Sequence, residues 1–251
     1  MDMLSRRSFT QGTLGSLLTF SLLETLYERD AFGADTAPDV SRWFADVNQL
    51  GWDLKEQQIS QADWRSKLEE LLAKVDLPAL LKSIDFDKLT KNVTLPDAGA
   101  RSLRFSFTQI EGAPQKLAYG KQVFAMKKGC SVVPHGHNNM ATAFIILQGK
   151  FRGKHYDRLA DEAKHVVIRP TIDREFGPAE YSTVTDEKDN VHWFKAESEG
   201  AFIFNLHAMN ITPGKGVPTG RIYLDPNGEK LDDGLIRARR INHDEATKLY
   251  G

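Results

Sequence analysis

Cysteine is almost absent from this sequence, and neither sign of charge is in clear excess. The single cysteine, Cys130, excludes an intramolecular disulfide, so the fold depends on its core or on a metal. Lysine and arginine, 33 residues together, nearly cancel aspartate and glutamate, 34 residues, and the formal net charge is -1. Charge therefore gives no reason to expect a nucleic acid or an anionic membrane as a partner.

The first 34 residues are similar to a twin-arginine export signal. Arg6 and Arg7 follow a serine, Phe9 lies at the expected offset, and a moderately apolar stretch begins at about residue 14. The alternative is an ordinary amphipathic N-terminal helix. We expect a signal over residues 1–34 and a mature protein that is periplasmic or secreted. No membrane span should remain after signal removal, because no other run approaches the ~18 to 20 apolar residues of a span.

Residues 35–95 have the periodicity of helices. Apolar residues recur at spacings of three and four in the stretches 40–54 and 64–75, which gives each stretch one apolar face. Ser60 followed by Asp63 predicts a capping box at the start of the second helix. We expect these helices to form a layer that packs on the domain that follows, although their tryptophans and leucines could also line a ligand site.

Residues 96–251 show a different pattern. Short runs rich in β-branched and aromatic residues are separated by Gly, Pro and Asp clusters, without long helices between them. Such a pattern is typical of an antiparallel sandwich or a small barrel. We therefore predict a mainly β domain over 96–251 with the helical layer 35–95 on its N-terminal side.

The stretch VPHGHNNM, residues 133–140, places two histidines one residue apart. In an extended chain, residues i and i+2 point to the same face, so His135 and His137 would present two imidazoles toward one point. A third ligand must come from another strand. His192 is the best candidate because it opens a strand after a polar turn. A lone histidine in a strand is usually structural, but the pair and a distant third histidine favour a metal site.

The remaining histidines are weaker candidates. His155 and His165 flank charged sequence that is typical of loops, and His243 lies in a polar, helical tail. His207 shares a strand face with Asn205, so we expect it to contact a ligand residue rather than bind metal itself.

The stretch HGHNNMATAFIILQG resembles the first motif of the cupin superfamily, in which a His-x-His pair precedes an acidic residue and a glycine. Gly149 supplies the glycine, Thr142 stands at the acidic position, and His192 matches the histidine of the second cupin motif. The resemblance implies a double-stranded β-helix whose metal site has three histidines and no carboxylate. Thr142 would then be either a hydrogen-bonding partner of the site or simply a strand residue on the inner face.

Within the cupins, the chain resembles the thiol dioxygenases of the cysteamine dioxygenase and plant cysteine oxidase type. The similarity is carried by LQGKFRGKHYDRL, NVHWF and ITPGKGVPTGRIY and spans about residues 60–225. It departs from that group where Asn205 takes the place of an acidic residue. The resemblance implies a small-molecule substrate, such as a thiol, with O2 as co-substrate. Nearby polar groups such as Asn205, His207 or Tyr223 would orient the bound substrate or oxygen, and the resemblance to the cupins implies a homodimer.

The metal expected at His135, His137 and His192 is iron(II), because oxygen activation needs a redox-active centre that zinc cannot provide. Zinc, manganese and nickel are the alternatives.

Two classes of function stay open. The first is an exported nonheme iron dioxygenase that oxidises a small thiol to a sulfinate. The second is a metal-binding cupin without oxidation, either a small-molecule binding module or a zinc or manganese hydrolase or isomerase. The missing carboxylate favours the first class, because hydrolytic sites generally use an acid or base carboxylate near the metal. Glu180, Glu187 or Glu197 could supply one by folding back.

Three other features have mainly structural expectations. Cys130 is expected to be a small buried residue, and the basic run 237–240 a solvated helix face. The long insertion 153–190 between the two histidine motifs is expected to build part of the substrate pocket.

Overall fold

The computed structural model describes residues 40–107, 114, 116–214, 216 and 218–251. These residues belong to one compact unit, Pro38–Gly251. The predicted export signal at residues 1–34 lies outside the described residues. Within the part of the chain that is described, no helix combines the length and apolarity needed to cross a membrane.

The N-terminal part is helical, as predicted. It contains α2 (Val40–Lys55), α3 (Gln61–Leu72), α4 (Leu77–Ser83) and α5 (Phe86–Thr90). The predicted capping box begins α3: Ser60 Oγ accepts from the backbone N–H of Asp63 at 3.0 Å, and Ser60 N–H donates to the Asp63 carboxylate at 3.4 Å.

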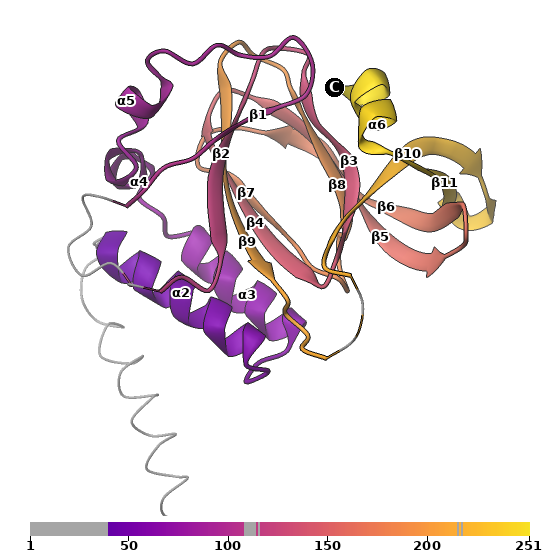
Figure 1. Cartoon of the computed structure of the whole chain (residues 1–251), viewed down its shortest axis with the longest axis horizontal. Coiled ribbons are helices and arrows are strands. Elements are labelled where there is room, and N and C mark those ends of the chain that lie inside the picture. Colours follow the sequence, from indigo (N-terminus) through magenta and orange to yellow (C-terminus); the bar gives the residue numbers. More distant parts are fainter. Residues whose placement is uncertain (1–39, 108–113, 115, 215, 217) are drawn as a thin grey trace, which may run out of the picture. The chain divides into compact units, whose positions relative to one another are not determined.

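The rest of the chain is mainly β, in two antiparallel systems. A 5-stranded sheet has the order β1-β2-β9-β4-β7, and a closed barrel has the order β10-β11-β6-β5-β8-β3 (Figure 1). The strands are β1 (Arg101–Leu103), β2 (Gly120–Met126), β3 (Ser131–Asn138), β4 (Met140–Gln148), β5 (Phe151–Asp161), β6 (His165–Phe176), β7 (Tyr181–Val184), β8 (Val191–Ala196), β9 (Ala201–Met209), β10 (Gly220–Lys230) and β11 (Ile236–Ile241). The predicted mainly β fold with an N-terminal helical layer is confirmed.

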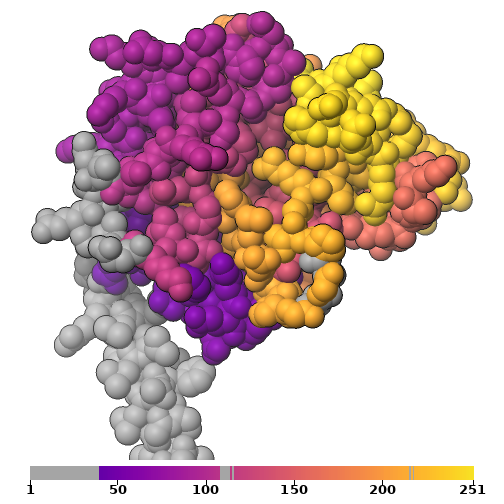
Figure 2. Space-filling model, in the orientation of Figure 1, coloured from indigo at the N-terminus to yellow at the C-terminus, as the bar shows by residue number. Residues whose placement is uncertain are grey.

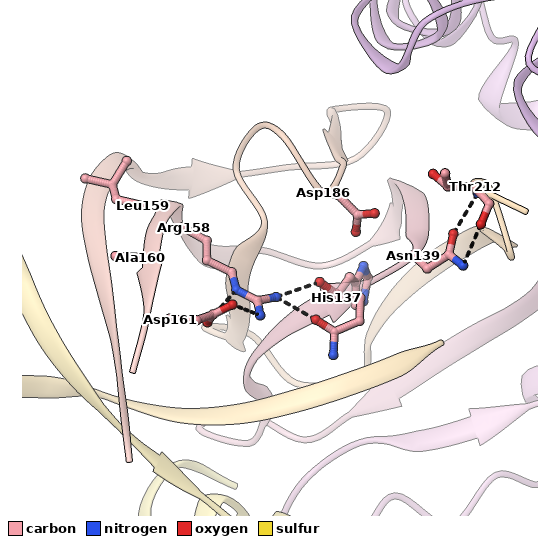
Figure 3. Close-up of a pocket in the computed structure, with 9 residues that line it drawn as sticks. His137, Asn139, Arg158, Leu159, Ala160, Asp161, Asp186 and Thr212 are labelled. Carbon is pink, nitrogen blue, oxygen red and sulfur yellow. Dashed lines mark hydrogen bonds and ion pairs between the residues drawn. The ribbon is translucent and has the colours of Figure 1, made fainter. Parts of the chain in front are cut away.

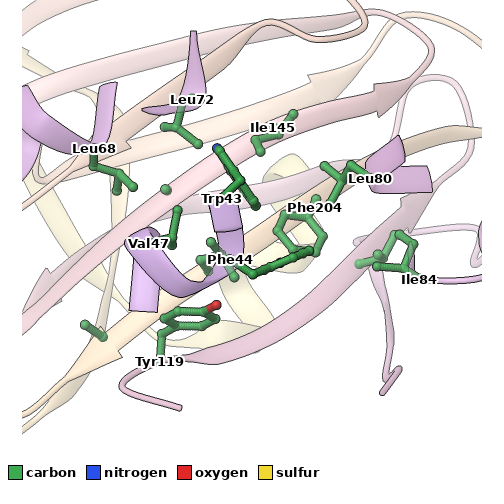
Figure 4. Packing of buried hydrophobic residues seen from close by; sticks show 14 of the residues in the cluster. Trp43, Phe44, Val47, Leu68, Leu72, Leu80, Ile84, Tyr119, Ile145 and Phe204 are labelled. Atoms are coloured by element: carbon green, nitrogen blue, oxygen red, sulfur yellow. The ribbon is translucent and has the colours of Figure 1, made fainter. Parts of the chain in front are cut away.

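The helices cover the outer face of the 5-stranded sheet (Figures 1 and 4). Phe44 of α2 is 1% exposed and meets Phe204 of β9 edge to face, with ring centroids 6.4 Å apart. Trp43 Nε1 donates to the carbonyl of Leu71 at 2.8 Å, which ties α2 to α3. The predicted docking role of the helical layer is confirmed, and the opposite face of the sheet is left for the barrel.

Strand alternation determines what the inner face of this sheet presents. On β9, Phe204 and Leu206 pack toward the helices, so Ile203, Asn205 and His207 point to the other side. Ile203 lies there in an apolar cluster that joins both sheets. The space between the sheets is therefore apolar at one end and becomes polar along β9.

The C-terminal helix α6 (His243–Tyr250) holds one barrel strand in place. The Tyr250 hydroxyl donates to the Asp225 carboxylate of β10 at 2.5 Å. Figure 2 shows this C-terminal segment, in yellow, on the surface of the molecule. The helical tail predicted around His243 is confirmed, and it packs next to the strand that carries Tyr223.

The assignment of His155 and His165 to loop-like sequence is wrong. Both lie in one long hairpin, in which β5 and β6 pair from Phe151 with Phe176 to Asp161 with Val166. Its charged residues lie on an exposed strand face and pair across it, so a high charge density did not indicate a loop.

The basic run 237–240 is a strand, β11, and not a helix face. Arg237 pairs with Glu162 at 2.6 Å, and Arg240 pairs with Asp161 at 2.6 Å. These acidic partners come from the β5–β6 hairpin, which the local sequence around the run does not reveal. Cys130, by contrast, is buried and free, as predicted.

Candidate metal centre

The structure brings the three predicted ligands together between the sheets. His135 and His137 lie on β3, and His192 lies on β8 directly opposite His135 in the strand register. The ring centroid of His192 is 4.4 Å from that of His135 and 4.8 Å from that of His137. One ring nitrogen of each falls within 4.8 Å of the others, and each residue is at most 1% exposed.

Each imidazole forms a hydrogen bond through its Nδ1 atom. His135 Nδ1 donates to the carbonyl of Val133 at 2.7 Å, and His192 Nδ1 donates to the carbonyl of Asn190 at 3.1 Å. A carbonyl can only accept, so in these two neutral rings the lone pair is on Nε2. His137 Nδ1 lies 3.3 Å from Thr142 Oγ1, so Thr142 is a hydrogen-bonding partner of the site.

The three Nε2 atoms are buried and have no hydrogen-bond partner. Burial is the main cause that lowers the pKa of all three histidines well below the usual value, which keeps the rings neutral. Buried acceptors without partners are rare, and three that converge on one point need a shared partner. A divalent metal ion fits this donor set, since neutral imidazole nitrogen is its commonest protein ligand.

No carboxylate belongs to this cluster in the described part of the chain. The metal-ligating group consists of the three histidines alone, without Glu180, Glu187 or Glu197. Glu180 instead accepts from Arg174 at 2.5 Å and from the backbone N–H of Gly177 at 2.6 Å. The ligand set is therefore electrically neutral.

Asn190 connects two of the ligands, a role that sequence analysis missed. Its side chain accepts from the N–H of His137 at 3.2 Å and donates to the carbonyl of His137 at 3.0 Å. Its own carbonyl accepts from His192. The preceding residue, Asp189, forms an ion pair with Arg65 of α3 at 2.9 Å, so the helical layer supports the loop that positions Asn190.

Gly136, between the two ligands of β3, is expected to be essential for the hydrogen bonds between Asn190 and the backbone of His137. A Cβ at this position would lie 2.8 Å from Asn190 Oδ1 and 3.2 Å from side-chain atoms of Ile222 and Val191. Gly136→Ala should displace Asn190 and weaken metal affinity by roughly 10- to 100-fold. This is the usual effect of removing a residue that hydrogen-bonds a metal ligand. Chelator competition measures this affinity. Gly177→Ala is the control, because its Cβ would meet only Glu180 at 3.6 Å. Unchanged affinity in Gly136→Ala would contradict the role given to Asn190.

The predicted orienting residues Asn205 and His207 lie on the inner wall opposite the histidines. Asn205 Oδ1 accepts from Gln122 Nε2 at 3.2 Å and from His207 Nδ1 at 3.2 Å. The imidazole of His207 occupies the space beside Gly120 where a side chain would otherwise lie. His207 is not part of the metal-ligating cluster found among the described residues. Tyr223 lies beside the cluster, with its ring centroid 6.2 Å from that of His135.

Two residues lie near the cluster although sequence analysis did not predict them there. His155 is fully buried and pairs with His192 across β5 and β8, with ring centroids 6.1 Å apart. Burial lowers the pKa of His155 to about 3, and its ring lies 3.3 Å from Ser182 Oγ. Arg221 is the register partner of His137 on β10. The alternation of polar and apolar residues around His155 could have indicated a strand, but nothing local signals Arg221.

A cavity of about 280 Å³ opens beside His137 (Figure 3). Arg158 donates to the carbonyl of His137 at 3.0 Å and to Asn138 Oδ1 at 2.7 Å, and it pairs with Asp161 at 2.6 Å. The lining residues are His137, Asn138, Asn139, Arg158, Leu159, Ala160, Asp161, Asp186 and Thr212. The insertion between the histidine motifs thus builds part of this wall.

Comparison with known proteins gives structural matches only. No family model matches the chain, and no curated protein sequence matches it. An 11S globulin from Wrightia tinctoria matches with a TM-score of 0.30 and 11% identity, over 36% of this chain and 20% of the globulin. The chain therefore spans about a fifth of the length of that protein.

Two smaller proteins also match. A double-stranded β-helix protein from Klebsiella pneumoniae has a TM-score of 0.34 and 10% identity, over 53% of this chain and 88% of its own. A cupin superfamily protein from Desulfitobacterium hafniense has a TM-score of 0.30 and 13% identity, over 47% of this chain and 83% of its own.

Proposed function

We propose that this protein is a nonheme iron(II) dioxygenase that oxidises a small thiol to a sulfinate. The observation that carries the proposal is the cluster of three buried, neutral imidazoles whose Nε2 atoms have no partner and no carboxylate beside them. His135, His137 and His192 would hold the metal. Iron(II) would supply a redox-active centre at which a thiolate and dioxygen meet.

The neutral ligand set favours an anionic co-ligand. Three imidazoles leave the full charge of a divalent ion uncompensated, which lowers the pKa of a thiol at the site and favours the thiolate. The reaction is balanced without a further reductant: the O–O bond breaks, two S–O bonds form, and dioxygen accepts the four electrons that sulfur loses. A hydrolase would instead need an acid or base close to the metal, and the ligating cluster contains none.

The protein's own residues would orient and shield the reactants. Val133, Asn190 and Thr142 fix the three rings through their Nδ1 atoms. The Phe144 ring lies 5.1 Å from that of His192 and closes the apolar side of the site against water. Asn205 and His207 present polar groups from the opposite wall.

We also propose that the protein is exported through the twin-arginine route. Arg6, Arg7 and the apolar stretch that follows support this proposal. This route accepts proteins that are already folded, so a metal buried between two sheets could be inserted before export.

Oxygen uptake with a panel of small thiols tests the proposed reaction. The iron-loaded protein should consume one O2 per thiol, and labelled dioxygen should place both oxygen atoms in the sulfinate product. Zinc-loaded protein is the control, because zinc holds the same site without redox chemistry. If the iron-loaded protein consumes no oxygen with any thiol, the oxidative function is wrong and a non-oxidative metal-binding role replaces it.

A further inference from the structure

Arg221 of β10 lies beside the histidine cluster. On β10 it pairs in register with His137, and Tyr223 pairs with His135. Side chains of residues directly opposite each other in a sheet share a face, so Arg221 lies on the same face as the ligands. Its Cζ atom is 6.0 Å from the ring centroid of Phe124, which belongs to β2 in the other sheet. Arg221 is exposed, unlike the buried histidines, and thus lies toward solvent.

The positive charge of Arg221 has no counter-ion in the described part of the chain. Its guanidinium makes no ion pair or hydrogen bond there. A bound divalent metal would add two further positive charges. The site therefore attracts an anion and disfavours a cation.

A second donor without an acceptor lies on the inner face of β9. Asn205 is 1% exposed, and its Oδ1 already accepts from Gln122 and His207. These two contacts fix the orientation of the amide, and its Nδ2 is left buried without a partner. An unsatisfied buried donor is costly unless a ligand supplies an acceptor. Asn205 thus points to a ligand with acceptor oxygens rather than to an amine.

We infer that Arg221 binds an anionic group of the substrate, with Asn205 donating a second hydrogen bond to the same ligand. Resting on the proposed function, this inference identifies the substrate as a small thiol that carries a carboxylate. An aminothiol would place a second cation beside Arg221 and the metal, and it would leave Asn205 Nδ2 without an acceptor. The carboxylate fits because it can accept a forked, charge-assisted pair of hydrogen bonds from arginine.

Binding of two matched probes to the metal-loaded protein tests the inference. The probes are 3-mercaptopropionate and its neutral amide, and calorimetry under anaerobic conditions measures each affinity. We expect the wild type to prefer the carboxylate by roughly tenfold or more, the usual scale of a hydrogen bond to a charged group. Arg221→Gln should remove this preference, and Arg221→Lys should keep part of it. Arg239→Gln is the control. Arg239 lies on the neighbouring strand β11, and it already forms an ion pair with Glu245 of α6 at 2.7 Å.

The outcomes separate this inference from the proposed reaction. If Arg221→Gln keeps the preference for the carboxylate, or if the wild type binds both probes equally, the role of Arg221 is wrong. Arg221-dependent carboxylate binding without oxygen uptake would support the anion site and overturn the oxidation. Oxygen uptake at equal rates with the carboxylate and the amide would support the oxidation and overturn the anion site.

Discussion

His192→Ala should weaken metal affinity at least 100-fold. This exceeds the roughly 10- to 100-fold effect of removing a residue that only hydrogen-bonds a metal ligand. His192 is the ligand that comes from a second strand, and its removal leaves only the His135–His137 pair of β3. Oxygen uptake with a thiol should fall below detection in the same variant. Chelator competition and the oxygen electrode measure the two effects.

His155→Ala is the matched control for this prediction. His155 is as buried as His192 and lies opposite it in the strand register, yet it is outside the ligating cluster. Both variants remove an imidazole from the same interior, so both should lower stability. Only His192→Ala should weaken metal affinity at least 100-fold. Equal loss of metal in the two variants would show that general disruption of the interior, rather than loss of a ligand, explains the result.

Phe44→Ala should destabilise the whole described unit by about 3–5 kcal/mol, the usual range for removing a large buried aromatic side chain. Phe44 is 1% exposed and packs from α2 against Phe204 of the sheet. For a domain of this size, such a loss lowers Tm by roughly 6–20 °C. Thermal unfolding followed by circular dichroism measures the shift, and the helical and β signals should change together.

Leu249→Ala provides the comparison for this change. Leu249 is 51% exposed on α6, so its truncation should alter stability by no more than about 0.5 kcal/mol. Two separate unfolding transitions in Phe44→Ala would contradict the integration of the helical layer with the sheet. A loss as small as that of Leu249→Ala would contradict the packing at Phe44.

The local patterns of the sequence were sufficient to predict most of the fold. Apolar spacing predicted the helices, and the Ser60–Asp63 pair predicted the start of α3. The failures had two causes, a strand face that is exposed and charged, and a pairing that is distant in the chain. The β5–β6 hairpin is highly charged because one face is exposed, and the basic strand β11 finds its acidic partners on that hairpin. The pairing of β11 with the hairpin is not visible in the local sequence.

In the candidate site, too, some residues are predictable from the local sequence and others depend on distant strand pairing. The spacing of His135 and His137 is a local feature, and the strand context of His192 is also readable from the chain. Arg221 reaches the site only because β10 pairs with β3, more than eighty positions away in the sequence. Asn190 could be seen beside His192, but its clamp on His137 depends on β3 and β8 lying side by side.

The central claim is that one metal ion is bound by the three unpartnered Nε2 atoms. Anomalous diffraction from crystals of the protein, with data collected above and below the iron absorption edge, tests it most directly. We expect one strong peak at about 2.0–2.1 Å from Nε2 of His135, His137 and His192, the usual length of a bond between zinc and an imidazole nitrogen. This peak should disappear below the edge. No peak between these nitrogens, or a peak coordinated by other residues, would contradict the account.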